Sequence, residues 1–394
     1  MYHYSKPTIS EKDIENVVKV LRSEYLTQGP ITNEFERKLE EKFGSRFAIT
    51  CNSGTSALHM TYQVLGLGPK KGLVTSAITF MATANAAKMC NAPVAFSDVD
   101  PRTGNVNLET IKRAVDNADF EVKVISVVHL GGRPVDIEAI YEFSKSIGAY
   151  LIEDACHAPL AQYLDTKGNM CKVGNCNHSI VTTLSFHAIK HITTGEGGAV
   201  LTNNEEVAEK IKLLRSHNII KNNELFVDKS EQSNPWYYEM SEIGYNYRLS
   251  DINCALGLNQ IDDLEKNILE RDKLSKIYNS YLKTIKGINI PIEIDVKKGL
   301  NAWHLYSPRF DFEFFSTTRS FVMSELKNSG IGTQVHYIPL YRLPFYKSEN
   351  NAKNFPGAEK YYLSTLSLPM YSGLNDEDIA KIVDKLLQVL KTER

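Results

Sequence analysis

The sequence has 394 residues, of which 42% are hydrophobic and 23% charged, and its net charge at pH 7 is −2. These values are typical of a globular protein of roughly two or three domains, and they exclude a disordered or fibrous chain. The near-neutral charge gives no overall attraction to nucleic acid or to an anionic membrane. Any phosphate group that the protein binds must therefore be held by local groups.

The first residues contain no apolar signal core, and no apolar run reaches the roughly 18 residues of a transmembrane helix. The sequence therefore predicts a soluble cytoplasmic protein. Six cysteines are scattered along it, which favours free thiols over a disulfide framework. Cys171 and Cys176 lie close to His178 in the sequence. This segment could therefore be a metal site or a Gly/Asn-rich loop with incidental thiols. Zinc sites usually have tighter paired spacings, which favours the loop.

Two amphipathic helices are predicted before the first strand. A capping-box pattern at Ser10 and Asp13 precedes apolar residues that share one helical face, namely Ile14, Val17, Val18 and Leu21. The second helix places apolar side chains at i, i+4 and i+8, namely Phe35, Leu39 and Phe43.

Strands and helices then alternate. The predicted strands cover 46–51, 73–76, 94–97, 122–129, 150–153, 180–185 and 199–202, the last of them antiparallel. The predicted helices cover 55–65, 80–90, 108–117 and 137–147. Short apolar strands without polar alternation indicate a mostly parallel sheet buried on both faces. The repeated β-α-β units predict a doubly wound α/β domain.

The pattern changes near residue 205, where long helical periodicity begins and continues to about 283. The polar stretch 221–234 within it has no apolar periodicity and is predicted to be a surface loop. The remaining chain is mixed, with strands expected near 305–310 and 333–336 and helices near 318–327 and 376–390. We therefore expect a large α/β domain over 1–253 and a smaller α+β domain over 254–394.

Ligands of open α/β sheets bind at the carboxyl ends of strands, and three polar clusters fall at such ends. The first cluster has the sequence NSGTSAL at 52–58, between a strand and a helix. Its small residues let backbone N–H groups approach an anion at the helix N-terminus, although a plain Ser/Thr helix cap explains them equally well.

The second cluster, EDACH at 153–157, follows the strand at 150–153. A carboxylate at a strand end, here Asp154, can hold the proton on a pyridine nitrogen, so that the ring accepts electrons from a substrate carbanion. Considered alone, Asp154 is equally consistent with a structural cap or a metal ligand.

The third cluster is SFHAIK at 185–190, followed by HITTGEGG at 191–198. A lysine just beyond a buried strand is unusual, because lysine is rarely buried without a role. Burial in a cleft lowers the pKa of an amine, and the neutral Lys190 amine could then form a Schiff base. The alternative is a surface lysine whose alkyl stem covers apolar neighbours.

These clusters are similar to those of the DegT/DnrJ/StrS sugar aminotransferases, and the resemblance covers essentially the whole chain. Its markers, in order, are LTQG at 26–29, NSGTSAL at 52–58, ITFMATAN at 78–85, EDACH at 153–157, SFHAIK at 185–190, GYNYRLSD at 244–251, WHLY at 303–306 and QVHY at 334–337. The resemblance implies the aspartate aminotransferase-like fold of type I enzymes that use pyridoxal 5'-phosphate (PLP).

The resemblance also implies roles for individual residues. Lys190 would bind PLP covalently and move the proton between the cofactor and the sugar carbon, and Asp154 would pair with the pyridine nitrogen. The remaining contacts of the cofactor would come from Ser53, Gly54, Thr55 and Ser185 at the phosphate, Phe80 stacked on the ring, and His157 near the ring hydroxyl. Asn246 would reach the phosphate from the partner subunit, so a homodimer would share its active sites.

Contacts to the nucleotide sugar are expected from Thr27, His187, Arg248, His336 and Tyr337. Instead of binding substrate, Arg248 could form a structural salt bridge, and His336 could be a histidine packed in the core. The segment before Lys190 is similar to that of family members that aminate C4 of UDP-sugars. The strings YSKP at 4–7 and QVHYIPLY at 334–341 are most similar to members of pseudaminic acid biosynthesis, which use glutamate as the amino donor.

The sequence is also consistent with other functions. Within PLP chemistry, the alternative is a 4-aminotransferase that makes a perosamine-, viosamine- or bacillosamine-type sugar. A regulator that binds PLP or sugar without turnover is a second class, but no helix-turn-helix or basic stripe supports it. A metal enzyme built on Cys171, Cys176, His178 and His157 is the third, and metal analysis of the purified protein would test it.

Overall fold

A computed structural model describes residues 1–295, 297–347 and 351–391. At the centre of the described chain lies a seven-stranded sheet in the order β1-β9-β8-β5-β4-β2-β3. Its strands are β1 (Phe47–Cys51), β2 (Lys71–Ser76), β3 (Val94–Ser97), β4 (Glu121–Val128), β5 (Tyr150–Asp154), β8 (Val181–Ser185) and β9 (Gly198–Thr202). Strand β9 pairs antiparallel with β1 and β8, and the other neighbouring strands of this sheet pair in parallel. The predicted parallel sheet with an antiparallel last strand is confirmed.

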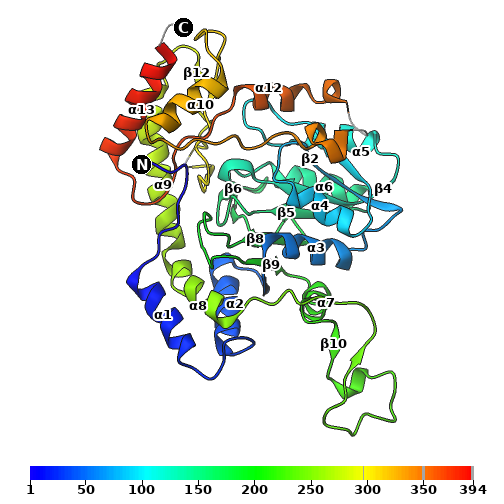
Figure 1. Ribbon diagram of the computed structural model, residues 1–394. Coiled ribbons are helices and arrows are strands. Elements are labelled where there is room, and N and C mark those ends of the chain that lie inside the picture. The colour runs from blue at the N-terminus through cyan, green and yellow to red at the C-terminus, as the bar shows by residue number, and fades with distance from the viewer. Residues whose placement is uncertain (296, 348–350, 392–394) are drawn as a thin grey trace.

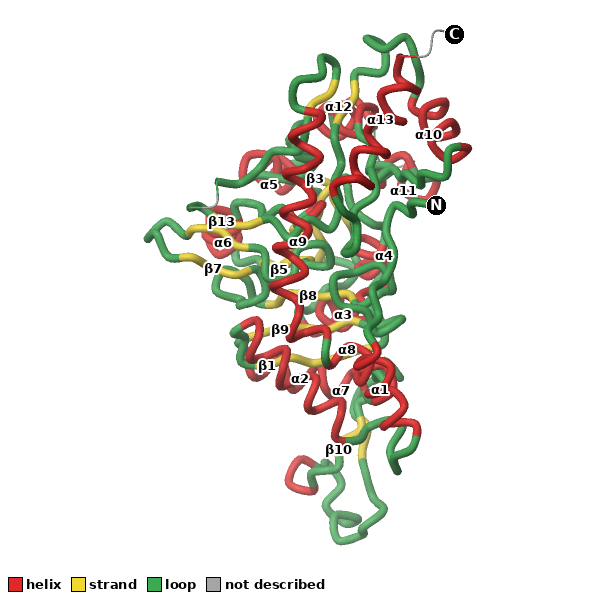
Figure 2. The backbone as a smooth tube through the Cα atoms, turned by 90° about the vertical axis from the view of Figure 1, so that its left-hand side faces the viewer, coloured by secondary structure: helices red, strands yellow, loops and turns green. Residues whose placement is uncertain are grey.

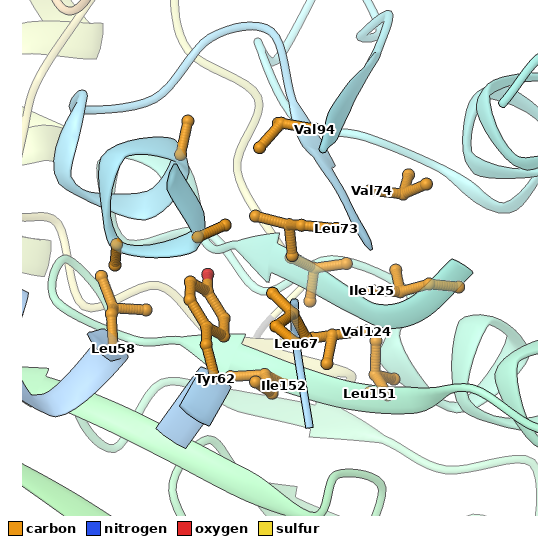
Figure 3. Close-up of a cluster of buried hydrophobic side chains, with 14 of the residues drawn as sticks. Leu58, Tyr62, Leu67, Leu73, Val74, Val94, Val124, Ile125, Leu151 and Ile152 are labelled. Carbon is orange, nitrogen blue, oxygen red and sulfur yellow. The ribbon is translucent and has the colours of Figure 1, made fainter. Parts of the chain in front are cut away.

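Helices cover both faces of the sheet (Figure 1). They are α2 (Pro30–Phe43), α3 (Gly54–Val64), α4 (Ala82–Met89), α5 (Leu108–Asp116), α6 (Ile137–Ser146) and α7 (Glu205–Arg215). Successive strand residues point to opposite faces of the sheet. Ile49 of β1 therefore packs in one core with Leu58 of α3. Its neighbour Ala48 packs in a second core with Phe35 of α2. Figure 3 shows Leu58 and Tyr62 beside apolar residues of the sheet.

The C-terminal part has its own core, in which the buried rings of Tyr278 and Tyr306 stack with centroids 4.5 Å apart. Its helices are α8 (Asp251–Leu258), α9 (Gln260–Leu282), α10 (Arg319–Asn328), α11 (Pro344–Lys347), α12 (Pro356–Ser364) and α13 (Asp376–Lys391), and its paired strands are β12 (Ile288–Asn289) and β14 (Arg309–Phe310). Figure 2 shows α9 passing in front of the sheet, and its N-terminal half packs in the same core as α2. The predicted boundary after residue 253 falls within α8 and remains a prediction.

Some predicted elements are wrong. The strand expected near 333–336 is an extended segment with one isolated bridge, Gln334 to Ser367. The segment around Cys171 is not a plain loop, because β6 (Gln162–Leu164), β7 (Met170–Lys172) and β13 (Gly299–Leu300) form a small antiparallel sheet. Strands of two or three residues and single bridges leave little periodic signal in a sequence. Neither the isolated bridge at Gln334 nor the small sheet could therefore be recognised from the sequence.

Helix α1 (Glu11–Leu21) begins with the predicted capping box between Ser10 and Asp13. Its predicted apolar face, however, is only partly buried in this chain: Val17 and Val18 are half-buried, whereas Ile14 is 45% exposed and Leu21 is 55% exposed. The segment before α1 crosses to the C-terminal part, where the Tyr2 N–H donates to the Gly330 carbonyl over 2.7 Å.

Residues 216–246 form an arm that projects from the body after α7 (Figures 1 and 2). The helical pattern predicted through this stretch is wrong, because the arm holds only the paired strands β10 (Ile219–Ile220) and β11 (Glu239–Met240) and a 3-10 turn at Asn223–Leu225. The surface loop expected at 221–234 lies within it. The arm exposes large apolar side chains, namely Leu225, Val227, Trp236, Tyr238, Met240 and Ile243. No helix in the described residues combines the length and apolar character needed to cross a membrane.

Candidate active site

A cleft of about 700 Å³ lies at the carboxyl ends of β5 and β8, closed on one side by the segment 334–340 of the C-terminal part. It brings together most of the residues proposed for cofactor and substrate: Ser53, Gly54, Thr55, Phe80, Asp154, His157, Ser185, His187, Lys190, His336 and Tyr337. These residues lie far apart in the sequence. The sheet brings those that follow its strands to one edge, where the segment with His336 and Tyr337 meets them.

Asp154 ends β5 and is 5% exposed. Its Oδ2 accepts a hydrogen bond from the Thr83 hydroxyl over 2.8 Å, and its Oδ1 accepts one from the Cys156 N–H over 3.2 Å. Both donors are neutral, so this buried carboxylate is hydrogen-bonded but has no directly bonded cation among the described residues. A buried carboxylate of this kind is suited to a cationic ring nitrogen.

The N-terminus of α3 forms one corner of the cleft. Gly54 opens the helix, and the first amides of a helix have no partners within it. A Cβ at position 54 would lie 3.0 Å from the Ser185 Cβ, so the two segments approach closely only because Gly54 lacks a side chain. The Ser53 side chain caps the helix by accepting from the Ser56 N–H over 3.1 Å. This corner therefore provides the amides and hydroxyl groups that a phosphate requires.

Lys190 follows β8 and points into the cleft, where protein atoms largely surround it. Burial lowers the pKa of its amine, and the opposing effects of Cys156 and Asp154 are smaller. Its Nζ lies 3.5 Å from Nε2 of His304. A lysine of lowered pKa forms the neutral, nucleophilic amine at a lower pH than an exposed lysine does.

An aromatic wall lines the cleft beside Lys190. The Nδ1 of His157 accepts from the Gly131 N–H over 3.3 Å, which leaves Nε2–H to donate to the Tyr337 hydroxyl over 3.0 Å. Tyr337 lies 6.0 Å from Phe80, ring centroid to centroid, and Phe80 is 52% exposed. An exposed ring at the edge of a cleft is placed to cover a planar ligand.

His336 and His187 differ in environment. His336 is 5% exposed, its Nδ1 pairs with the Ser367 hydroxyl over 2.8 Å, and burial lowers its pKa to about 3. It is therefore neutral at physiological pH and suits a sugar oxygen better than a diphosphate. His187 is exposed, with Nε2 3.9 Å from the carboxylate of Glu196.

Thr27, Asn246 and Arg248 do not line the cleft of this chain. They lie on two neighbouring surface segments, since the Asp251 N–H donates to the Leu26 carbonyl over 3.0 Å. Within one chain these three residues are therefore not brought together with the other residues proposed for the site. No arginine lines the cleft among the described residues.

No role was predicted for Tyr4, Thr83 and Cys156, which line the cleft. None was predicted for His304 either, which does not line the cleft but contacts Lys190. Thr83 and His304 stand within the markers ITFMATAN and WHLY, and Cys156 stands within EDACH. Their side-chain directions depend on tertiary packing, so the sequence marked their neighbourhood but not their contacts.

The cysteine segment does not gather into a ligand set. Cys171 lies in β7, whereas the Cys176 thiol approaches the Leu201 carbonyl at 3.3 Å, and His178 pairs with the Tyr163 hydroxyl over 2.8 Å. Within the described residues, no group of three His, Cys, Asp or Glu side chains could hold a metal ion.

The model of the DegT/DnrJ/EryC1/StrS aminotransferase family matches residues 7–387. The chain belongs to this family. It is 38% identical over 397 residues to a UDP-4-amino-4,6-dideoxy-N-acetyl-beta-L-altrosamine transaminase of Campylobacter jejuni, covering 99% of this chain and 98% of the relative. Among solved structures, Helicobacter pylori PseC, an aminotransferase of pseudaminic acid biosynthesis, has a TM-score of 0.87, 30% identity and 99% coverage of both chains.

A sugar aminotransferase candidate from Streptococcus pneumoniae, solved in its PLP form, has a TM-score of 0.85, 25% identity and 98% coverage of both chains. As a member of the DegT/DnrJ/EryC1/StrS family, the protein is a PLP-dependent sugar aminotransferase, and the predicted fold and cofactor class are confirmed at this level. The cleft suits PLP, because its lining includes an amide-rich phosphate corner, a buried carboxylate without a bonded cation among the described residues, and Lys190.

Proposed function

We propose that this protein transfers the amino group of glutamate to C4 of a nucleotide-linked 4-keto-6-deoxy sugar. The proposed substrate is UDP-2-acetamido-2,6-dideoxy-β-L-arabino-hex-4-ulose, and the product is UDP-4-amino-4,6-dideoxy-N-acetyl-β-L-altrosamine. The observation that carries the proposal is the pairing of Lys190 and Asp154 in one cleft of a chain that is 38% identical to a transaminase of this name.

Different residues of the cleft would transfer protons and bind the cofactor. When bound, PLP supplies an electron sink for the carbanion that forms as the amino donor loses its α-proton. The Lys190 amine takes up that proton and later delivers a proton to C4 of the sugar, and such transfer by a positioned group contributes about 10²–10⁴-fold to rate. Asp154 would keep the ring nitrogen protonated, while Gly54, Thr55 and Ser185 would bind the phosphate. His157 would contact the ring hydroxyl, and Phe80 would cover the ring face.

We also propose that the protein is a cytoplasmic homodimer with shared active sites. Two exposed apolar surfaces support a second copy of the chain as partner: the face of α1 with Ile14 and Leu21, and the arm 216–246. Asn246 of the partner subunit would complete the phosphate site. Thr27 and Arg248 lie close to Asn246 on the same surface, so a diphosphate would meet the Arg248 charge that the cleft of one chain lacks.

A substrate panel tests the proposed reaction. Purified protein with PLP and glutamate is offered UDP-, GDP- and dTDP-linked 4-keto-6-deoxy sugars, and release of 2-oxoglutarate is measured. Preference for the UDP-linked N-acetylated sugar is expected. Preference for a GDP- or dTDP-linked sugar would contradict the proposed substrate, and a visible cofactor spectrum that glutamate does not change would favour a non-catalytic binding protein.

A further inference from the structure

A second histidine reaches Lys190 from the C-terminal part of the chain. His304 is 2% exposed, and its Nε2 lies 3.5 Å from Nζ of Lys190, the outer limit of a hydrogen bond. It follows β13 in the chain and is contributed by a segment remote in sequence from the strand ends that carry Lys190 and Asp154. The contact therefore joins the two parts of the chain at the amine itself.

The backbone around His304 is fixed on both sides. The Ala302 N–H donates to the Gly132 carbonyl over 2.8 Å, and the Leu305 N–H donates to the Gly131 carbonyl over 3.2 Å. A Cβ at Gly132 would lie 2.5 Å from the Trp303 nitrogen, so only glycine allows this approach, at a φ of +99°. The imidazole is consequently presented to Lys190 by a rigid support rather than by a free loop.

The neighbouring imidazoles form hydrogen bonds with groups other than Lys190. Both ring nitrogens of His157 have partners, in the Gly131 N–H and the Tyr337 hydroxyl. His191 donates through Nε2 to the Ala302 carbonyl over 2.8 Å, and His336 pairs with Ser367. Among the hydrogen bonds of the described residues, His304 is the imidazole that contacts the Lys190 amine.

His304 also stays neutral. Its pKa lies well below the ordinary histidine value because of burial, and the nearby cations and imidazoles add to the effect. The titratable groups that face this pair are Asp154, Cys156, His157, His191, His336 and Arg271. A neutral imidazole can accept a hydrogen bond from an ammonium group without removing its proton.

We propose that His304 is a positioning residue that accepts a hydrogen bond at Nε2 from the Lys190 amine and stabilises its protonated form between the two proton transfers. This inference rests on the proposed function, in which Lys190 carries the proton. An ammonium group has only N–H donors, so the imidazole must present the lone pair of Nε2 and keep its hydrogen on Nδ1, which is buried and has no hydrogen-bond partner among the described residues. Without that acceptor, the buried ammonium ion would lose a charge-assisted hydrogen bond.

Competitive labelling of the apoprotein tests the proposal without cofactor or substrate. Trace acetic anhydride is applied across a pH series, and labelling of the peptide that contains Lys190 is measured by mass spectrometry. In His304→Phe, which has no acceptor, the titration midpoint of Lys190 should fall by about one pH unit, a tenfold change in the ionisation constant. His304→Gln, whose amide oxygen accepts, should restore most of this shift.

His178→Gln is the matched control, because His178 pairs with Tyr163 outside the cleft; its midpoint should equal that of the wild type. A midpoint in His304→Phe that equals or exceeds the wild-type value would overturn the proposal. If that variant does not fold, ¹⁵N spectra of wild-type apoprotein decide: hydrogen on Nδ1 of His304 supports the proposal, and hydrogen on Nε2 rejects it. Failure of the proposed function would instead appear in Lys190→Ala, as cofactor absorbance that persists.

Discussion

The Thr83 hydroxyl donates its hydrogen to Oδ2 of Asp154 over 2.8 Å, joining α4 to the carboxyl end of β5. Thr83 has only one hydroxyl hydrogen, so in its 3.1 Å contact with Thr79 the hydrogen must come from Thr79. A chain of hydroxyl groups therefore ends on the carboxylate that is proposed to hold the cofactor nitrogen.

Removing that hydroxyl should affect both the stability of the protein and its affinity for PLP. Thr83→Val preserves the shape of the side chain but leaves a buried carboxylate oxygen without its donor, which costs about 1–3 kcal/mol. We expect a lower free energy of unfolding in urea and a weaker affinity for PLP. Thr83→Ser keeps the hydroxyl and should remain close to the wild type; equal stability and affinity in Thr83→Val would contradict the role of this hydrogen bond.

Asp154→Asn separates the charge of the carboxylate from its shape. The amide oxygen can still accept from Thr83 or the Cys156 N–H, so the fold should be retained. The negative charge that holds the ring nitrogen protonated is lost, and we expect turnover to fall by about 10²-fold or more, in the range of one electrostatic group. Circular dichroism checks the fold and 2-oxoglutarate release checks the rate. Near-wild-type turnover in a folded variant would show that Asp154 has another role.

The sequence predicted the sheet and many of the residues that line the cleft, but not the contacts between distant segments. Strands β5 and β8 were recognised from apolar runs, and Asp154 and Lys190 follow from their positions at strand ends. The contacts of Thr83 and His304 could not be predicted, because each joins segments far apart in the chain. In the arm 216–246 the surface loop at 221–234 was predicted, but the short paired strands β10 and β11 on either side of it were not, because strands of two residues leave no periodic signal. The places of Thr27 and Arg248 outside the cleft likewise depend on how distant segments of the chain pack.

Shared active sites can be tested by mixing inactive variants. Lys190→Ala lacks the amine, and Asn246→Asp should repel the cofactor phosphate in the neighbouring subunit. In a two-fold dimer, half of a random mixture is hybrid and each hybrid has one intact site, so about a quarter of wild-type activity should return. The measurement is turnover after the two variants are unfolded together and refolded. Activity no greater than that of the separate variants would exclude a shared site.

The buried histidines should make the apoprotein sensitive to acid. Burial lowers the pKa of His157, His191, His304 and His336, the last to about 3 from an ordinary value of 6.5. Below pH 6.5 these histidines become protonated in the unfolded chain but stay neutral in the folded protein. The free energy of unfolding therefore falls as the pH drops from 6.5 towards 3.

The contribution of a single histidine can be isolated by substitution. His336→Gln should reduce the slope of this decline by up to about 1.4 kcal/mol per pH unit between pH 6 and pH 4. Urea unfolding of both apoproteins at several pH values gives the two slopes. Parallel pH dependence in variant and wild type would show that His336 is not held neutral in the folded state.

The visible spectrum of Lys190→Ala reconstituted with PLP tests the central claim most directly. If Lys190 binds the cofactor covalently, this variant should lose the visible absorbance of the lysine-bound cofactor and release no 2-oxoglutarate from glutamate. Lys190→Arg, which keeps a positive charge but cannot form the bond, should behave in the same way. Wild-type absorbance and turnover in Lys190→Ala would contradict the assignment of this residue and the active site built around it.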